Sequence, residues 1–257
     1  MARTDTLPHF LTDVADAIRT KKGTSETILA SDFDTEIENL PSGGDYNVKV
    51  DTTQTYASGN NGGIKRLITE VGDIDTSSMS NMNYMFSHCT NLRKISSLDT
   101  SNATSMDNMF EECSNLISIP SLDTANVTSM YSTFKNCYFL TSVPRLDINR
   151  VTNASYMFNG CRRLTTVSFD NTNICSPNSV ANMFNNCQQL THIDIRSFDF
   201  SNTTSYTSMF GASATNGVPD DCEIIVADDT QKTWITDKFT RLTNVKTVAE
   251  YEAEQNA

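Results

Sequence analysis

The sequence predicts an α+β repeat solenoid, a parallel β stack with short helical turns that follows a small two-helix N-terminal module. Three observations predict this class. The dipeptide Met-Phe recurs through the centre of the chain, the residues around it keep fixed spacings, and hydrophobic residues make up only 38 % of the composition. A solenoid tolerates a low hydrophobic fraction because each unit buries only a narrow apolar strip against its neighbours.

The repeat is aligned on a phenylalanine column whose members are separated by 24, 24, 24, 26 and 26 residues. They are Phe86, Phe110, Phe134, Phe158, Phe184 and Phe210. Three residues later, five copies carry cysteine: Cys89, Cys113, Cys137, Cys161 and Cys187. In these copies leucine follows six residues after the phenylalanine, and isoleucine or valine nine residues after it. Such registered columns identify a structural repeat.

Each Leu-x-x-Ile/Val segment predicts a short strand, and stacked copies form a parallel sheet with a spacing of ~4.8 Å. Side chains that alternate with the apolar ones face outward, which predicts an exposed strand face of polar residues. Its candidate members are Lys94, Ser96, Ser118, Ser142, Thr166, His192 and Asp194. Pro120 and Pro144 lack an N–H group, so the paired strand is expected to end before them.

The remainder of the unit is expected to begin as a turn at Asp99 and to continue as a short helical turn. The apolar residues that share one face of this helical turn are Met106, Met109, Phe110 and Cys113. The two extra residues of the longer copies come after Val167 and after Ile193. Insertions at one place in a repeat indicate a loop on one face of the stack.

The motifs Met-Phe-x-x-Cys-x-x-Leu and Leu-Asp-Thr-Ser-Asn give this unit a family resemblance. It resembles the leucine-rich repeats of bacterial surface antigens, in the variant common in Mycoplasma lipoprotein-like proteins, over residues 64–226. The resemblance implies a leucine-rich-repeat-like stack of about five to six turns. For function it implies only a generic recognition and spacer scaffold, since one fold serves many roles.

The cysteine column is interpreted as core packing, because a free cysteine packs like a small hydrophobe. Disulfides, reactive thiols and a metal site are the alternatives, although no Cys-x-x-Cys pair is present. Cys175 and Cys222 lie outside the column, where partial exposure is expected. The aspartate column, eleven residues before each phenylalanine and replaced once by Asn173, is interpreted as turn caps, with cation binding as the alternative. No cofactor and no metal is expected.

Residues 1–44 predict a two-helix attachment module. Its candidate attachment face consists of Leu7, Phe10, Leu11, Val14, Ile18, Phe33 and Ile37, which follow helical spacing. The motifs Leu-Thr-Asp-Val-Ala-Asp-Ala-Ile-Arg (11–19), Lys-Gly-Thr-Ser-Glu (22–26) and Asp-Phe-Asp-Thr-Glu-Ile (32–37) resemble an N-terminal segment of phage and prophage tail and baseplate proteins. The resemblance implies attachment to a virion. A cap over the first repeat is the alternative.

Three further regions are expected. Residues 45–63 form a strand and a flexible linker, and residues 64–226 form the solenoid, which ends in a last strand at Glu223–Val226. Residues 227–257 form a C-terminal cap, with a helix that begins at Asp228-Asp229-Thr230 and a frayed tail from Glu250.

Composition and motifs exclude several function classes. A net charge of −12 disfavours nucleic acid and anionic membranes. No run of about 20 apolar residues predicts a membrane span, and the N-terminus lacks a signal-peptide pattern. The three histidines, His9, His88 and His192, stand in no catalytic motif, so no catalytic residue is expected. A hidden pair of carboxylates, as in glycosidases, is the open alternative.

The expected function is that of a non-enzymatic virion protein of a bacteriophage tail or baseplate. Residues 1–44 would contact other virion proteins, and the solenoid would bind a host cell-surface ligand or neighbouring subunits. The protein is expected to assemble in the host cytoplasm, to leave by lysis and to form a homo-oligomer. A bacterial surface adhesin, a head-decoration or neck protein, and a cell-wall-degrading enzyme are the alternatives.

Overall fold

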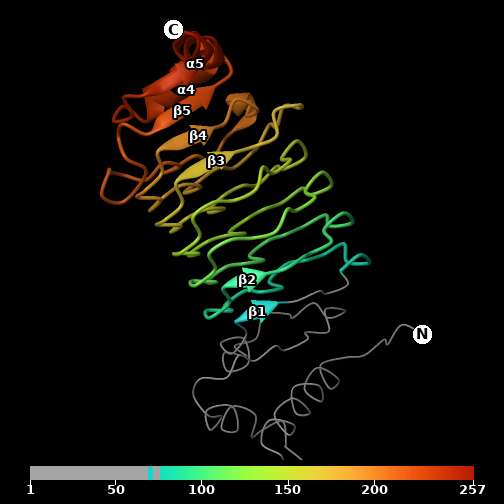
Figure 1. The fold of residues 1–257 in the computed structure, drawn as a ribbon. Coiled ribbons are helices and arrows are strands. Elements are labelled where there is room, and N and C mark those ends of the chain that lie inside the picture. Colours follow the sequence, from blue (N-terminus) through green and yellow to red (C-terminus); the bar gives the residue numbers. More distant parts are fainter. Residues whose placement is uncertain (1–68, 72–75) are drawn as a thin grey trace, which may run out of the picture.

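The computed structural model describes residues 69–71 and 76–257. The predicted attachment module (1–44) and linker (45–63) therefore lie outside the described residues, as does the candidate attachment face of Leu7, Phe10, Leu11, Val14, Ile18, Phe33 and Ile37. In the described part, turns of the chain lie one above another from β1 to the C-terminal helices (Figure 1).

Two parallel sheets mark one side of this stack. Strands β1 (Glu70–Val71) and β2 (Lys94–Ile95) form the first sheet, with Val71 opposite Ile95. Strands β3 (Thr166–Ser168), β4 (His192–Asp194), β5 (Glu223–Val226) and β6 (Val245–Thr247) form the second in that order, all parallel. The predicted parallel pairing is confirmed for these strands. The expectation that Glu223–Val226 is the last strand is wrong, because β6 pairs with it.

No regular strand lies between β2 and β3 in the described chain; isolated bridges, such as Ser142↔Thr166, and single hydrogen bonds, such as that from the N–H of Ile117 to the carbonyl of Arg93 at 3.3 Å, continue the ladder there. The cause is the proline in each of two turns. In β2 the N–H of Ser96 donates to the carbonyl of Val71 at 2.9 Å. Pro120 and Pro144 occupy the equivalent positions and have no N–H to donate. The prolines thus interrupt the ladder more fully than predicted.

A second ladder runs along the stack at the start of each Met-Phe segment. Parallel bridges join Asn81 to Ser105, Ser105 to Ser129, and Ser129 to Asn153, and the series continues through Ser179 to Ser205. Side-chain hydroxyls extend it: Thr128 Oγ1 donates to the carbonyl of Thr104 at 3.1 Å. Polar groups therefore supply much of the contact between turns, which explains the low hydrophobic content.

The helical turn predicted for residues 106–113 is wrong. The N–H groups of Met106, Asn108 and Phe110 donate to carbonyls of the next turn, at 2.8–3.1 Å, and so are not free for a helix. Between them, the N–H of Asp107 donates to Oδ1 of Asn83 in the preceding turn at 2.7 Å, and that of Met109 bonds locally to the carbonyl of Met106 at 3.2 Å. Asn108 and Glu112 have φ values of 56° and 61°. The segment is thus a series of tight turns, and the equivalent segments share its pattern.

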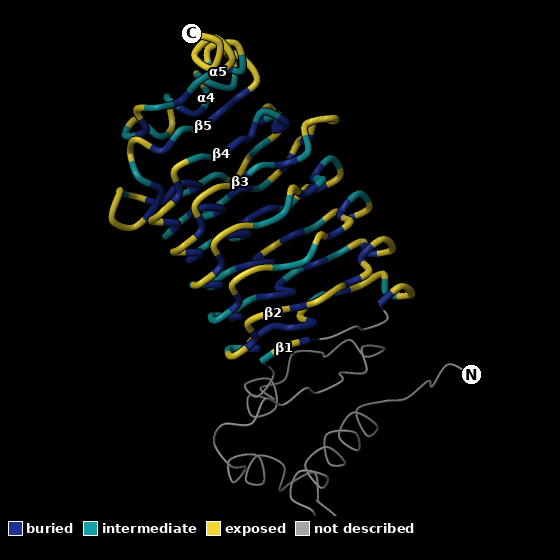
Figure 2. The backbone as a smooth tube through the Cα atoms, in the orientation of Figure 1, coloured by how far each residue is buried: buried dark blue, intermediate teal, exposed yellow. Residues whose placement is uncertain are grey.

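The phenylalanine column forms the centre of the core. Neighbouring rings stack from Phe86 to Phe210, with centroid distances of 5.4–5.8 Å and interplanar angles of 5–14°. Stacking of this kind contributes about 0.5–1.5 kcal/mol per pair beyond burial. Buried residues lie inside each turn and exposed ones at its edges (Figure 2).

The C-terminal region closes one end of the stack. Helix α4 (Asp229–Lys238) begins after Asp228, whose side chain accepts from the N–H of Gln231, as predicted. The tail expected to fray from Glu250 is instead helix α5 (Val248–Gln255). Thr247 and Glu250 form a reciprocal capping box at its start, which fixes the first turn. Before α4 lies a short 3₁₀ helix, η2 (Phe200–Asn202). None of the described helices has the length and apolar character required to cross a membrane.

Candidate functional site

The outward side of the Leu-x-x-Ile/Val segments forms a continuous surface, which we call the strand face. It comprises residues 90–97, 114–121, 138–145, 162–169 and 188–195. Five of the predicted members are exposed: Lys94, Ser96, Ser118, Ser142 and Thr166. Hydrogen bonds hold adjacent rows together, because the N–H of Thr165 donates to the carbonyl of Thr141 at 3.2 Å, and that of Thr191 to Thr165 at 2.9 Å.

The strand face ends at the cap, where two predicted members behave differently. Asp194 is buried, so its assignment as an exposed residue is wrong; its carboxylate accepts from Nε of Arg196 at 2.9 Å. His192 is half-buried, and its Nδ1 lies 2.8 Å from Oε2 of Glu223. The α5 residue Tyr251 lies near its ring, at 6.0 Å between centroids. Helix α5 thus limits access to this end of the face.

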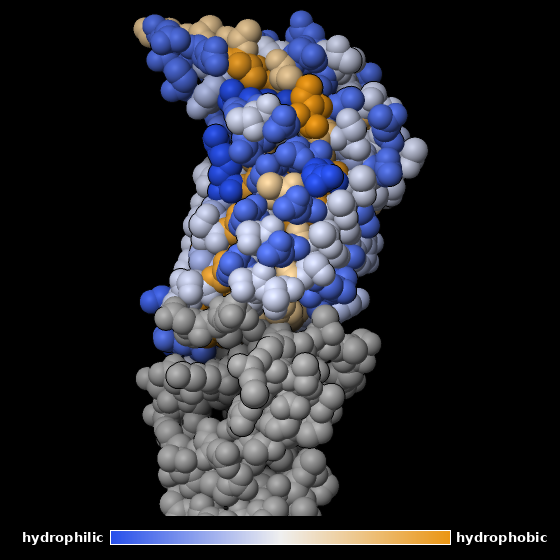
Figure 3. Space-filling model, turned by 90° about the vertical axis from the view of Figure 1, so that its right-hand side faces the viewer, coloured by the Kyte–Doolittle hydropathy of each residue, from blue (hydrophilic) through white to orange (hydrophobic). Residues whose placement is uncertain are grey.

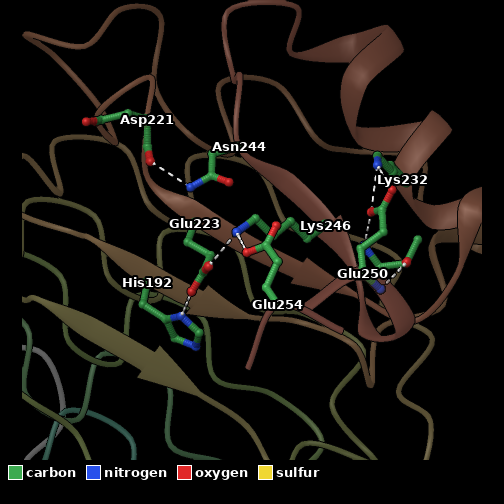
Figure 4. A network of polar contacts seen from close by, with 9 residues as sticks. His192, Asp221, Glu223, Lys232, Asn244, Lys246, Glu250 and Glu254 are labelled. Atoms are coloured by element: carbon green, nitrogen blue, oxygen red, sulfur yellow. Dashed lines mark hydrogen bonds and ion pairs between the residues drawn. The ribbon is translucent and has the colours of Figure 1, made fainter. Parts of the chain in front are cut away.

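Glu223 is the centre of a polar network that joins β4, β5, β6 and α5 (Figure 4). Lys246 Nζ lies 3.1 Å from Oε1 of Glu223 and also pairs with Glu254. Burial raises the pKa of the Glu223 carboxyl, but the hydrogen bonds from His192 and Lys246 outweigh it and lower the pKa overall. The network fastens the cap to the stack, and these contacts satisfy its charges.

The strand face carries almost no negative charge in a strongly acidic chain. The chain has 31 Asp and Glu residues against 19 Lys and Arg. The five segments contain only Asp194, which is buried and paired, as an acid. Their basic residues are Arg93, Lys94, Arg145, Arg162 and Arg163. These five segments therefore have the opposite charge to the molecule as a whole, and an exposed acid next to them, Glu70 of β1, lies opposite Lys94.

An aromatic–arginine cluster lies within the strand face, and sequence reasoning missed it. The guanidinium of Arg162 lies 4.8 Å from the ring centroid of Tyr138, and that of Arg163 lies 4.3 Å from Phe139. Phe139 is 40 % exposed, and Ile117 in the preceding turn is 50 % exposed. The available signal was the pair of dipeptides Tyr138-Phe139 and Arg162-Arg163, which are separated by one repeat.

Within the part of the chain that the structure describes, the basic side chains of the cluster and of the β2 row have no acidic ion-pair partner. Arg93, Lys94, Arg162 and Arg163 form no ion pair or side-chain hydrogen bond with another residue in the described ranges. Cation–π contact needs no hydrogen-bond acceptor, so the N–H donors of both stacked arginines stay available for a ligand. The strand face can therefore bind anionic groups.

Figure 3 shows the side of the molecule that lies on the right in Figure 1. Hydrophilic side chains dominate it, and hydrophobic surface is confined to small separate areas. Exposed apolar residues that occur singly are normal for soluble domains. That surface offers no apolar patch comparable to a protein–protein interface.

The cysteine column lies in the core. All seven cysteines are buried and free, so the partial exposure expected for Cys175 and Cys222 is wrong. Burial raises the pKa of both the Cys175 and the Cys222 thiol to about 12. Burial also raises the pKa of Cys161 and keeps it protonated. Within residues 69–71 and 76–257, no cluster of three or more His, Cys, Asp and Glu residues could hold a metal ion.

The aspartate column caps turns at four of its positions. Asp99, Asp123, Asp147 and Asp199 each accept from the N–H two residues later, at 2.9–3.1 Å, as predicted. The prediction is wrong for Asn173. In that longer copy Asp170 takes the role and accepts from the N–H of Thr172 at 2.9 Å. The two added residues shift the turn, which the alignment did not detect.

The two histidines of the described chain contact different polar groups. His88 is exposed and its Nδ1 lies 2.8 Å from the hydroxyl of Ser87. The neighbouring Cys89 is buried, so the two side chains point apart. His192 contacts a carboxylate of the structural network rather than a nucleophile.

One family model matches the chain, over residues 59–168 and again over residues 115–221. Its description is "Mycoplasma protein of unknown function, DUF285". No curated protein matches the chain. The two matches overlap over residues 115–168, as expected when one model can be placed at more than one register of a repetitive sequence.

Proposed function

The chain belongs to the DUF285 family of Mycoplasma proteins of unknown function, and we propose that it is a non-enzymatic structural and binding protein. Its proposed fold class is an α+β repeat solenoid of the leucine-rich-repeat type, with about five to six turns across residues 64–226. Parallel bridges and ring stacking that recur once per repeat support this class.

The proposed binding surface is the strand face. The observation that carries this proposal is the absence of exposed acidic side chains from it, in a chain with a net charge of −12. Exposed Phe139 and Ile117 and the unpaired Arg162 and Arg163 lie together there. Aromatic and arginine side chains are enriched in recognition surfaces, and acidic ones are depleted.

The proposed location is a bacteriophage virion, in the tail or baseplate, with residues 1–44 bound to other virion proteins. The resemblance of residues 11–37 to an attachment segment of tail and baseplate proteins supports this location. Assembly would take place in the host cytoplasm, with release by lysis and with several copies arranged around a symmetry axis. A head-decoration or neck protein is the variant of this proposal within the virion.

The test is mass spectrometry of purified particles, with immuno-electron microscopy to find the position. The full chain is expected in particles, and a chain that lacks residues 1–44 is expected to be absent from them. As a matched control, the Arg162→Gln/Arg163→Gln chain is expected to be incorporated normally. Absence of the full chain from particles would overturn the proposed location.

A bacterial cell-surface adhesin is the second candidate. The family match favours it, because the matched model is described from Mycoplasma proteins and covers residues 59–221 without the attachment module. Fractionation of producing cells separates the two candidates. A surface-exposed, cell-bound chain in the absence of particles supports the adhesin.

A further inference from the structure

The strand face presents two cationic pairs, and the two rows between them carry one further exposed cation, Arg145. Arg93 and Lys94 are exposed in the row of β2, and Arg162 and Arg163 are exposed three turns later. At the ~4.8 Å spacing of stacked parallel strands, three turns separate the pairs by roughly 14 Å. Ligands that satisfy both pairs must therefore be extended and must carry anionic groups at intervals.

The rows between the pairs present hydroxyl groups. Ser118, Thr141 and Ser142 are exposed there, and no carboxylate is exposed in these rows. Hydroxyls both donate and accept hydrogen bonds, so they suit a ligand that is itself rich in hydroxyl groups. The apolar exposed faces of Phe139 and Ile117 lie beside them and suit the C–H faces of sugar rings.

We propose that the strand face binds an acidic polysaccharide, laid along the stack with its carboxylates at the two cationic pairs. This inference names a ligand class for the binding surface proposed above and rests on that proposal. A sparsely charged polymer fits these two pairs and Arg145, which are set among neutral hydroxyls. A dense polyphosphate such as nucleic acid fits poorly, because the rest of the chain is strongly negative and repels it.

The paired arginines form the stronger of the two anion sites. Contact with Tyr138 and Phe139 holds Arg162 and Arg163 in place, at 4.8 and 4.3 Å from the ring centroids. A held guanidinium loses less conformational entropy when it binds a carboxylate, and it binds with two N–H groups. Loss of the Phe139 ring should therefore weaken binding without any change of charge.

The experiment measures binding of the full chain to hyaluronate, which carries one carboxylate on every second sugar, by biolayer interferometry at low ionic strength. Arg163→Gln is expected to weaken binding at least tenfold, and Phe139→Ala at least threefold. Arg150→Gln is the matched control, because Arg150 is also exposed but lies outside the strand face. It removes the same charge and is expected to change binding less than twofold.

Dextran, poly-L-glutamate and oligothymidine serve as comparison ligands. The proposal expects the affinity for hyaluronate to exceed that for all three, and to fall as salt is added. It is overturned if the wild-type chain does not bind hyaluronate, if Arg150→Gln weakens binding as much as Arg163→Gln, or if polyglutamate or oligothymidine binds as tightly. Thermal melts confirm that each variant is folded. These outcomes do not depend on whether the chain is found in virions.

Discussion

The sulfur of Cys113 donates a hydrogen bond to the carbonyl oxygen of Phe86, one turn earlier, at 3.0 Å. The same contact recurs from Cys137 to Phe110 and from Cys161 to Phe134, at 3.1 Å each. The thiol therefore fills space and also satisfies a carbonyl at the turn. This contact explains why the column carries cysteine rather than alanine, because alanine has no donor group and would leave a cavity.

The buried thiols are expected to be unreactive in the folded protein. Ellman's reagent should modify fewer than one thiol per chain under native conditions and all seven after denaturation, because every cysteine is buried and burial raises the thiol pKa. Rapid modification of more than one thiol in the native state would contradict this packing.

The same thiols predict a loss of stability at alkaline pH. A thiol whose pKa is raised by folding keeps its proton in the native state, while the unfolded chain releases it above the ordinary value of 9.0. The contribution of these protonated thiols to the free energy of unfolding is therefore complete below pH about 8 and falls as pH rises toward 12. Urea unfolding of the wild type and of Cys175→Ala between pH about 8 and about 10.5 checks this, and the variant should lose less stability over that range.

Thr100 and Thr124 offer a matched pair of buried hydroxyls. Thr100 Oγ1 donates to the carbonyl of Asp123 at 2.8 Å, whereas Thr124 Oγ1 is buried without a partner among the described residues. Thr124→Val is expected to raise the free energy of unfolding by about 1 kcal/mol, and Thr100→Val to lower it by about 1 kcal/mol. The next copy already carries the apolar Ile148 at this position. Equal destabilisation by both variants would contradict the assignment.

The columns that repeat in the sequence could be predicted, and the backbone between them could not. Phe110 packs against the same residue of adjacent copies, and Asp99 accepts a local hydrogen bond, so both roles follow from residue type and repeat register. The 3-1-3 spacing of Met106, Met109, Phe110 and Cys113 fits both a helical turn and a series of tight turns. The deciding signal was the Asn and Gly at positions with positive φ, such as Asn136 and Gly160.

The functional surface was predicted only in part, for a related reason. The residues that recur in every copy of the repeat are those that build the core. Arg163 and Phe139 occupy the same repeat position in two different copies. Each residue type occurs there in only one copy, so the alignment of repeats does not single them out. Their contact depends on the stacking of two turns, which only the three-dimensional register reveals.

Positive φ angles predict opposite effects at two neighbouring turns. Ser132 has φ 54° and a buried hydroxyl without a described partner, so Ser132→Gly is expected to stabilise the protein by about 0.5–1 kcal/mol. Gly160 has φ 80°, and a Cβ there would lie 2.3 Å from Oδ1 of Asn136. Gly160→Ala is expected to destabilise by about 1–3 kcal/mol. Denaturant titration measures both changes, and destabilisation by Ser132→Gly would disprove the strain argument.

Glu223 is expected to stabilise the contact between the C-terminal cap and the stack, and its contribution to the free energy of unfolding should depend on pH. Its carboxylate contacts His192 at 2.8 Å and Lys246 at 3.1 Å, so Glu223→Gln is expected to lower the free energy of unfolding at neutral pH by less than about 1 kcal/mol. Burial raises the pKa of this carboxyl, but the two hydrogen bonds lower it by more. The pKa in the folded protein is therefore below the ordinary value of 4.5. The contribution is therefore complete above the unfolded pKa and is lost as pH falls through the folded value.

Thermal unfolding by circular dichroism at pH values from about 3 to about 7 checks this dependence. The difference in Tm between the wild type and Glu223→Gln should shrink toward the acidic end, as the wild-type carboxyl gains its proton. Glu252→Gln is the matched control on α5, because Glu252 is exposed and forms no ion pair within the described chain. A Tm difference that does not shrink as pH falls would show that Glu223 acts through packing rather than through its charge.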